Sequence, residues 1–578
     1  MSGIDWWIVG LYMAFTLAIG LWLARRASGS LEDFFVSGRA LPWWLAGTSM
    51  AATTFSVDTP LYVSGLVARR GIAGNWEWWA FALSHVLLIY LFARLWRRAE
   101  VVTDVELTEI RYGGRPAALL RGTRAFLFAV PINCIAIGYV MLAMRKVIEA
   151  LGLFEAMPAA LPGDARLWAV VALCVFVLVY ASLAGLWGVV ATDFFQFVLA
   201  LAGVLLVASF ALADIGGIPE LRAQLAAAGR SDALRMVPRP GSSALPFSTF
   251  LAYLGIQWWA FRRADGGGEF VQRLSACRNE RDAERAAWLF AILHYVIRAW
   301  PWILVGLVAV VVFPDLSDPE MGYPLLMLRY LPAGVLGLVV ASFVAAFMST
   351  VSTQINWGAS YLVNDLYARF VSPQAEQARL VRLGRLASIG IVAVAGVAAF
   401  YANDIGTVFR FMIAIGTGPG AVLILRWFWW RVNAWTELAA MLAGFLIAVV
   451  SYLPVWGEMS FGTRLAITAF GSAAVWVPVM LFTAPEQPDT LRRFYLRVRP
   501  GGPGWASIAR ELGIEPATHP GVGLARAGLG VLLLFGLMFA LGGALLLEWR
   551  TAAAATVVAL VGAIGLVMIR RTERVGTG

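Results

Sequence analysis

Residues 41–65 read LPWWLAGTSMAATTFSVDTPLYVSG, an apolar run that is long enough to cross a bilayer but is interrupted at its centre. The interruption consists of hydroxyl residues, one carboxylate and one proline: Thr53, Thr54, Ser56, Asp58, Thr59 and Pro60. Pro60 has no backbone N–H, so a carbonyl group about one turn earlier loses its helical partner. Membrane proteins tolerate such a break where the freed carbonyls line a cavity. The stretch therefore predicts a discontinuous membrane helix.

The composition of the whole chain excludes a soluble protein. The 578 residues are 60% hydrophobic and 14% charged, and the mean hydropathy is +0.76. A soluble domain carries about 25% charged residues. The formal net charge of +10 would suggest a nucleic-acid partner in a soluble protein. In membrane proteins basic residues collect in cytoplasmic loops instead, so we expect no nucleic-acid partner and predict a polytopic all-α protein in a lipid bilayer.

Hydropathy predicts about 15 membrane spans. The apolar runs cover residues 5–24, 42–66, 76–96, 125–149, 166–184, 187–213, 248–266, 286–312, 331–365, 385–402, 406–430, 435–455, 464–484, 527–547 and 551–570. Clusters of arginine follow odd-numbered runs, for example within 94–98, 273–285 and 492–499. Loops rich in positive charge stay in the cytoplasm, so this pattern predicts an N-terminus outside and a C-terminus inside.

A second polar cluster lies in the ninth run, which contains AAFMSTVSTQ at residues 345–354. Its hydroxyl residues are Ser349, Thr350, Ser352 and Thr353. Hydroxyl groups are common where membrane helices pack together, and this reading is the favoured one for the cluster alone. The alternative is a site for a hard cation, which binds oxygen ligands. The interrupted second run makes the cation site the stronger hypothesis.

Two carboxylates lie within apolar runs. A charged group in a membrane helix costs about 2.5–3.5 kcal/mol on insertion scales, so such residues usually mark the path of an ion or a substrate. Asp193 lies near the cytoplasmic end of the sixth run, where it could also reach the interface. Asp58 lies deeper, and its alternative role is to cap the broken helix.

Three segments together resemble the sodium:solute symporter family. They are residues 51–65, the stretch 345–354 followed by LVNDLY at 362–367, and FVQRLSACRNERDAERAA at 270–287. The resemblance implies a leucine-transporter-type fold of two inverted repeats with five helices each, in which the first helix of each repeat is broken. It implies an extra helix and a cytoplasmic loop at 1–41, repeats at 42–213 and 248–430, and flanking helices at 431–578 with a cytoplasmic loop at about 485–526.

The same resemblance implies a sodium site between the second and ninth runs. Its ligands would be the backbone carbonyls of Ala52, Phe55 and Ala346 and the hydroxyls of Ser349 and Thr350. Some members of the family hold a second sodium ion, and the matching residues here are Asp193, Ser352 and Thr353. One or two Na⁺ ions are thus the expected cofactors, and the number stays open.

The solute should bind near the middle of the membrane, beside the breaks in the second and seventh runs. The candidate ligands are Ser56, Asp58, Thr59, Glu77, Gln257, Trp258, Trp259 and Glu269. Residues 266–268 are three glycines, which form either an unwinding point or a plain loop. Carboxylates beside tryptophans favour a cation or a sugar, and they disfavour a monocarboxylate unless Arg262 or Arg263 reaches the site.

These features lead to one functional hypothesis. We expect a sodium-coupled transporter of the bacterial inner membrane that imports a small organic solute, namely a cationic amine, a sugar or polyol, or an amino acid. The residues show no catalytic constellation, so we expect no enzyme activity. Two alternatives are a symporter-like membrane sensor and a proton-coupled transporter in which Asp193 or Asp58 titrates. The oligomeric state stays open.

Overall fold

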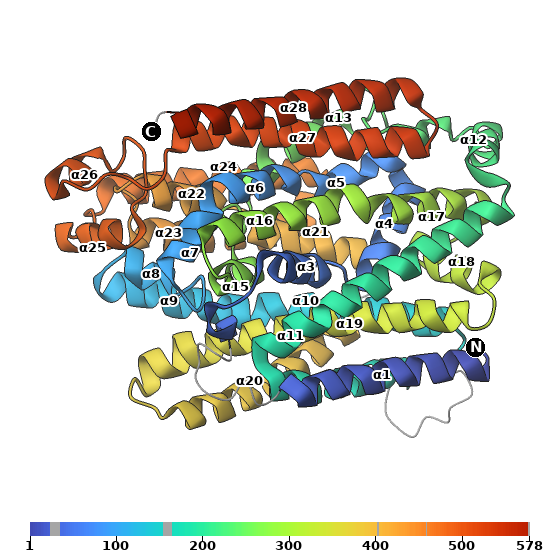
Figure 1. The fold of residues 1–578 in the computed structure, drawn as a ribbon, viewed down its shortest axis with the longest axis horizontal. Coiled ribbons are helices and arrows are strands. Elements are labelled where there is room, and N and C mark those ends of the chain that lie inside the picture. Colours follow the sequence, from blue (N-terminus) through green and yellow to red (C-terminus); the bar gives the residue numbers. More distant parts are fainter. Residues whose placement is uncertain (24–34, 154–164, 402–403, 458, 576–578) are drawn as a thin grey trace.

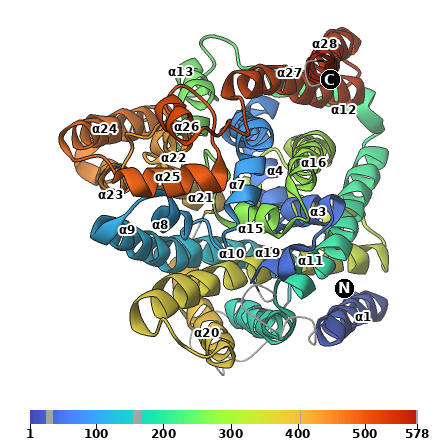
Figure 2. The same cartoon turned by 60° about the vertical axis from the view of Figure 1, so that its left-hand side comes forward.

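The computed structural model describes residues 1–23, 35–153, 165–401, 404–457 and 459–575. Within these ranges the chain is helical, and extended pairing is limited to three isolated bridges. The helices lie roughly along one long axis (Figure 1), with α1 and α20 on one flank and α27 and α28 on the other (Figure 2). The all-helical prediction is confirmed.

The helices and short helical turns have the following bounds. The N-terminal half contains α1 (Gly3–Leu23), η2 (Ser37–Arg39), α3 (Trp43–Thr53), α4 (Asp58–Arg70), η3 (Ile72–Asn75), α5 (Trp76–Trp79), α6 (Phe81–Leu87), η4 (Leu88–Phe92), α7 (Ala93–Ala99), α8 (Leu107–Arg111), α9 (Gly114–Leu127), η5 (Phe128–Ile132), α10 (Asn133–Ala150), α11 (Ala165–Asp214), α12 (Gly217–Ala227) and η6 (Ser231–Leu234). The C-terminal half contains α13 (Phe247–Ala252), η7 (Tyr253–Gln257), α14 (Trp258–Ala260), α15 (Gly268–Ala276), α16 (Glu280–Ala291), η8 (Ile292–Ile297), α17 (Ala299–Val312), η9 (Pro319–Met321), α18 (Gly322–Tyr330), α19 (Val335–Ser360), η10 (Tyr361–Val371), α20 (Gln377–Tyr401), α21 (Ile405–Gly416), α22 (Gly420–Phe428), α23 (Ala434–Ser451), η11 (Pro454–Trp456), α24 (Phe461–Phe482), α25 (Pro488–Val498), α26 (Ala506–Leu512), α27 (Pro520–Leu545) and α28 (Trp549–Val575).

Ten helical stretches in the described residues are long and apolar enough to cross a membrane. They cover 72–99, 114–150, 186–214, 280–312, 335–371, 377–401, 434–451, 461–482, 520–545 and 549–572. Each of these stretches overlaps one run expected from hydropathy, so the prediction of a multi-pass membrane protein is confirmed. Of the other five expected runs, those at 42–66, 248–266 and 406–430 contain broken helices.

Two of those five runs, 5–24 and 166–184, correspond to α1 (Gly3–Leu23) and to the first part of α11 (Ala165–Asp214). The second of these helices, α11, also contains the following run. Both ends of α11 lie near the same end of the bundle, because Arg166 pairs with Glu149 of α10 at 3.3 Å and Asp214 lies beside Tyr330 of α18. The chain therefore reverses direction within α11, and the two separate spans expected there stay a prediction.

The helix of the second run is broken, as predicted. α3 ends at Thr53, α4 begins at Asp58, and four non-helical residues lie between them. Pro60 occupies the first turn of α4, where a missing N–H costs no hydrogen bond. The carboxylate of Asp58 lies in the same turn, where the helix dipole favours negative charge.

The seventh run is also broken. The chain leaves helical geometry after α14 and resumes it in α15, and φ is positive at Gly266, Gly267 and Gly268. The glycine run is therefore an unwinding point. The non-helical segment, residues 261–267, continues the chain directly into α15 and brings polar side chains into the middle of the bundle.

The run at 406–430 was expected to be one span, and it is two helices. α21 and α22 are separated by Thr417, Gly418 and Pro419, and Gly418 has a φ of 126°. This break pairs with the previous one: the backbone N–H of Arg262 donates to Gly416 O at 2.7 Å, and that of Gly418 donates to Ala260 O at 2.8 Å. The pairing between distant segments makes the second break stable.

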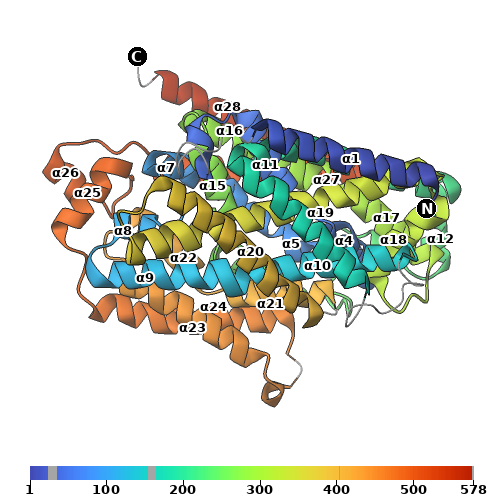
Figure 3. The same ribbon diagram turned by 90° about the horizontal axis from the view of Figure 1, so that it is seen from below.

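The stretch expected as a cytoplasmic loop at about 485–526 contains α25 and α26, which lie at one end of the bundle (Figure 3). Arg98 Nη1 donates to Val498 O at 3.0 Å, and Arg497 Nε donates to Ala99 O at 2.8 Å. Trp505 Nε1 donates to Trp427 O at 2.8 Å. The segment is therefore docked on the end of α7 and on α22.

The paired breaks predict a specific sensitivity at Gly420. A Cβ atom there would lie 2.3 Å from Trp259 O, so Gly420→Ala should push the two broken segments apart and lower stability by roughly 1–3 kcal/mol. The measurement is the melting temperature of the detergent-purified protein. Gly390→Ala in α20 is the control, because a Cβ at that position meets no atom within 4 Å. Equal melting temperatures for both variants would contradict the tight pairing of the breaks.

Candidate functional site

A cavity of about 200 Å³ lies between the break that separates α3 from α4 and the break that separates α14 from α15. Four of the predicted solute ligands line it: Ser56, Asp58, Thr59 and Glu269. The remaining walls come from α5, α6, α10, η8, α19 and α21 and are largely aromatic, including Trp78, Phe81, Tyr139, Phe261, Phe270, Tyr295 and Phe409. The structure therefore brings polar residues from both broken helices to one enclosed space.

Several polar atoms in this cavity have no hydrogen-bond partner among the described residues. The acceptors are Asp58 Oδ1, Glu269 Oε2 and Gln354 Oε1, and the others are Ser56 Oγ and the Nε atoms of Arg262 and Arg263. Leaving such groups unpaired in a buried position costs free energy. Their convergence on one cavity is therefore typical of a binding site for a polar ligand.

Four predicted solute ligands lie away from the cavity lining. Trp258 Nε1 and Trp259 Nε1 donate to carbonyls one turn earlier, at 2.8 Å and 2.5 Å. Gln257 Nε2 donates to the backbone carbonyl of Glu77 at 2.6 Å. Glu77 itself is fully buried among ion pairs described below. These four residues support the broken segments rather than the cavity surface.

The predicted sodium ligands lie where α3 ends against α19. Ala52, Phe55, Ala346, Ser349 and Thr350 are all buried. Contact between the two helices is direct, because Thr350 Oγ1 donates to Thr53 O at 3.2 Å. Thr53 Oγ1 also lies 3.3 Å from Thr353 Oγ1. The structure thus gathers backbone carbonyls at the break beside the hydroxyl cluster.

Asp193 lies at the centre of a second buried group. It accepts hydrogen bonds from the hydroxyls of Ser49 and Ser349, the latter at 2.6 Å. The guanidinium of Arg273 lies 3.7 Å from Asp193 Oδ2, and it donates to Thr353 Oγ1 at 2.8 Å. Ser352, in contrast, donates to Ser349 O. Asp193 and Thr353 therefore meet through Arg273, a residue that the sequence reasoning left out of the site.

Arg298 is a further buried cation that the sequence did not assign. Its Nη1 donates to Ala51 O at 2.6 Å, and its Nη2 donates to Thr54 O at 2.8 Å. These are carbonyls at the end of α3, which have no helical donor after the break. A positive charge at a helix C-terminus also complements the helix dipole. Arg298 therefore caps the interrupted helix from α17's N-terminus.

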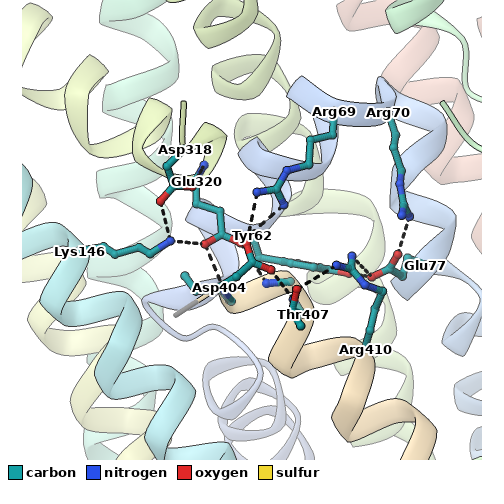
Figure 4. Close-up of polar contacts among 12 residues, drawn as sticks. Tyr62, Arg69, Arg70, Glu77, Lys146, Asp318, Glu320, Asp404, Thr407 and Arg410 are labelled. Atoms are coloured by element: carbon teal, nitrogen blue, oxygen red, sulfur yellow. Dashed lines mark hydrogen bonds and ion pairs between the residues drawn. The ribbon is translucent and has the colours of Figure 1, made fainter. Parts of the chain in front are cut away.

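Two buried glutamates collect donors from several elements near one end of the molecule (Figure 4). Glu77 accepts from Tyr62 at 2.8 Å and Tyr253 at 3.0 Å, and pairs with Arg70 at 2.7 Å and Arg410 at 3.6 Å. Glu320 pairs with Lys146 at 2.5 Å and Arg69 at 3.9 Å, and accepts from the backbone N–H groups of Ile405 and Gly406. We call this set the Glu77–Glu320 network; it joins α4, α5, α10, α21 and η9.

Another set of buried ion pairs lies toward the α8 and α22 end. Arg426 pairs with Asp265 at 2.7 Å and with Glu437 at 3.2 Å. Arg124 pairs with Glu437 at 2.6 Å and with Asp104 at 2.8 Å. These contacts join α9, α22 and α23 to the segment 261–267. The cavity therefore lies between two regions that are closed by charge pairs.

Comparisons with known proteins agree with this geometry. The sequence model of the Sodium:solute symporter family matches residues 34–444. The chain is 26% identical to the sodium/glucose cotransporter of Vibrio parahaemolyticus, covering 85% of this chain and 92% of that protein. It is 26% identical to the human sodium/myo-inositol cotransporter 2, covering 77% and 69%. The fold matches a solved Na⁺-coupled sialic acid symporter with a TM-score of 0.68 and 19% identity, covering 84% and 99%.

The Asp193–Arg273 pair predicts strong coupling between its two members. Arg273→Gln leaves a buried carboxylate uncompensated and should cost about 3–5 kcal/mol of stability. Adding Asp193→Asn removes that charge, so the double variant should melt at a higher temperature than Arg273→Gln alone.

The control is Arg492→Gln, which removes two exposed ion pairs, with Asp489 and Glu511, and should change the melting temperature little. Strictly additive effects of the Asp193 and Arg273 substitutions would show that the two side chains act independently.

Proposed function

The chain belongs to the sodium:solute symporter family, and we propose that this sodium-coupled symporter imports a small organic solute across a bacterial inner membrane by alternating access. The observation that carries the proposal is the cavity between two broken helices, with the end of α3 held against the hydroxyl cluster of α19. The family and the relatives are transporters rather than enzymes. The relatives are sodium cotransporters, which favours sodium coupling over the proton-coupled and sensor alternatives.

We propose the leucine-transporter-type arrangement with repeats at 42–213 and 248–430, flanked by 1–41 and 431–578. The breaks between α3 and α4 and between α14 and α15 support it, because each lies at the start of a proposed repeat. We also propose 15 spans, counting the broken and short helices, with the N-terminus outside. The docking of the arginine-rich segments of α7 and α25 on each other supports a cytoplasmic position for that end.

We propose that one sodium ion binds to the carbonyls of Ala52, Phe55 and Ala346 and the hydroxyls of Ser349 and Thr350. Neutral oxygen ligands suit a monovalent cation that must later leave. Their burial and the direct contact of Thr350 with α3 support this site. The second site, at Asp193, Ser352 and Thr353, already has the charge of Arg273 beside its carboxylate. We therefore favour one ion per cycle.

In this orientation the Glu77–Glu320 network lies on the extracellular side of the cavity. We propose that it closes the outer path and separates when the protein opens outward. Its members come from α4, α5, α10 and α21, so opening must part elements from both proposed repeats. Inward sodium movement is driven by the ion gradient and by the membrane potential, which contributes about 2.3 kcal/mol per charge per 100 mV.

The sodium site predicts ion-specific stabilisation. An ion that binds only the folded protein raises its melting temperature with concentration. The wild type should melt at a higher temperature in sodium than in potassium, and Ser349→Ala/Thr350→Ala should lose this difference. Ser388→Ala, which removes a buried hydroxyl of α20 bonded only to its own helix, should keep it. A wild type that melts equally in both salts would refute the sodium site.

The outer closure predicts a labelling signal at Lys146, the one lysine in the sequence. Its side chain is 7% exposed and pairs with Asp318 and Glu320, so a membrane-impermeant amine reagent should react slowly. Sodium without solute favours the outward-open state in our scheme and should accelerate the reaction in proteoliposomes. Lys146→Arg keeps the charge and measures the background from the N-terminus. Identical rates in sodium and potassium would argue against separation of the network.

A further inference from the structure

The cavity also carries information on the class of solute, an inference that rests on the proposed transport function. We propose that the solute bears a carboxylate, which binds to the guanidinium of Arg262. The relatives named above are cotransporters of glucose and myo-inositol, which are uncharged. A carboxylate ligand would therefore distinguish this chain from them.

Arg262 is a buried cation that lacks an anionic partner. It is 5% exposed and lines the cavity. Its guanidinium lies over the rings of Phe128 and Phe261, at 5.2 Å and 5.6 Å from their centroids. Among the described residues, its Nε has no acceptor and no carboxylate lies within 4.0 Å of it. The aromatic faces orient the guanidinium, but they supply neither a counter-charge nor the hydrogen bonds to water that the group lost on burial.

Neighbouring arginines differ from Arg262, because each of them has an acceptor within the protein. Arg263 pairs with Glu269 at 2.6 Å, and Arg426 pairs with Asp265 at 2.7 Å. Arg298 donates to backbone carbonyls at the end of α3. Each of these groups has an acceptor within the protein, whereas the guanidinium of Arg262 lines the cavity and its Nε has no acceptor among the described residues. A bidentate carboxylate is the ligand that fits a planar guanidinium.

The opposite broken helix supplies the complementary group. Asp58, in the first turn of α4, is 7% exposed and has one unpartnered oxygen, Oδ1, at the cavity. Glu269 is largely neutralised by Arg263, so Arg262 and Asp58 are the two charges of the cavity lining without a close ionic partner. A neutral polyol would leave the Arg262 charge uncompensated, and a simple cation would be repelled by it. A carboxylate with hydrogen-bond donors, as in an amino acid or a sugar acid, satisfies both groups.

A second pocket, of about 370 Å³, has several arginines in its lining. It is lined by five arginines and one acidic residue: Arg69, Arg70, Arg230, Arg235, Arg239 and Asp232. Arg69 and Arg70 also belong to the Glu77–Glu320 network, so this basic pocket adjoins the proposed outer path. Clefts lined by one sign of charge raise the local concentration of oppositely charged ligands. Arg235 and Arg239 pair with Asp232, and Arg70 pairs with Glu77, so the proposal rests on Arg262 rather than on this pocket.

Matched pairs of probes test the proposal. The pairs are D-glucuronate with D-glucose, and L-alanine and L-proline each with its primary amide, and choline serves as a pure cation. Sodium-dependent melting-temperature shifts are measured for the wild type, Arg262→Gln and the distant control Arg464→Gln. We expect shifts only from a carboxylate member. Arg262→Gln should weaken that binding at least about tenfold while keeping the shift produced by sodium alone.

The outcomes separate the solute class from the transport function. A larger shift from glucose, an amide or choline than from any carboxylate would overturn the proposal, as would unchanged carboxylate binding in Arg262→Gln or no shift from any carboxylate. Stabilisation by sodium alone would leave the symporter function standing in each of these cases. Asp58→Asn separates the two sources of carboxylate, because it should weaken an ammonium-bearing amino acid more than glucuronate.

Discussion

Every break in a membrane helix releases backbone groups that hydrocarbon cannot hydrogen-bond, and this constraint organises the molecule. The end of α3 is satisfied by the guanidinium of Arg298. The break before α15 is satisfied by the break between α21 and α22, through the bonds of Arg262 and Gly418. The cavity exists because these solutions hold the broken ends in place without filling the space between them. The binding region is thus a by-product of backbone hydrogen-bond satisfaction.

Local sequence predicted the features that depend on local chemistry. The hydroxyls, Asp58 and Pro60 predicted the first break. The family resemblance implied the second break, and the three glycines left open whether they form an unwinding point or a plain loop. The third break was missed, although Gly-Pro-Gly is a strong local signal, because one proline can also kink a continuous helix. The two runs predicted within α11 stay a prediction, and both ends of that segment lie near the same end of the bundle.

The site was predictable only in part, for a similar reason. Ser56, Asp58, Thr59 and Glu269 line the cavity, and each lies at a break that the sequence revealed. The place of Glu77 depends on Arg70, Tyr253 and Arg410, and the surroundings of Asp193 depend on Arg273. Partners that are tens or hundreds of residues apart leave no periodic signal in one sequence. In the sequence alone, each buried charge therefore resembles a ligand-binding residue. Only the three-dimensional contacts distinguish the residues that line the cavity from those that pair with other side chains.

Two buried arginines lie near the proposed sodium site, and they matter for the protein without bound sodium or solute. A symporter must change its facing direction without cargo in order to begin another turnover. Arg273 lies 3.7 Å from Asp193 Oδ2, and Arg298 Nη1 donates to Ala51 O at the end of α3. The partners of the Asp193 carboxylate and of the α3 carbonyls are thus side chains of the protein itself. Neither group depends on a bound ion for compensation, which suits a return step without cargo.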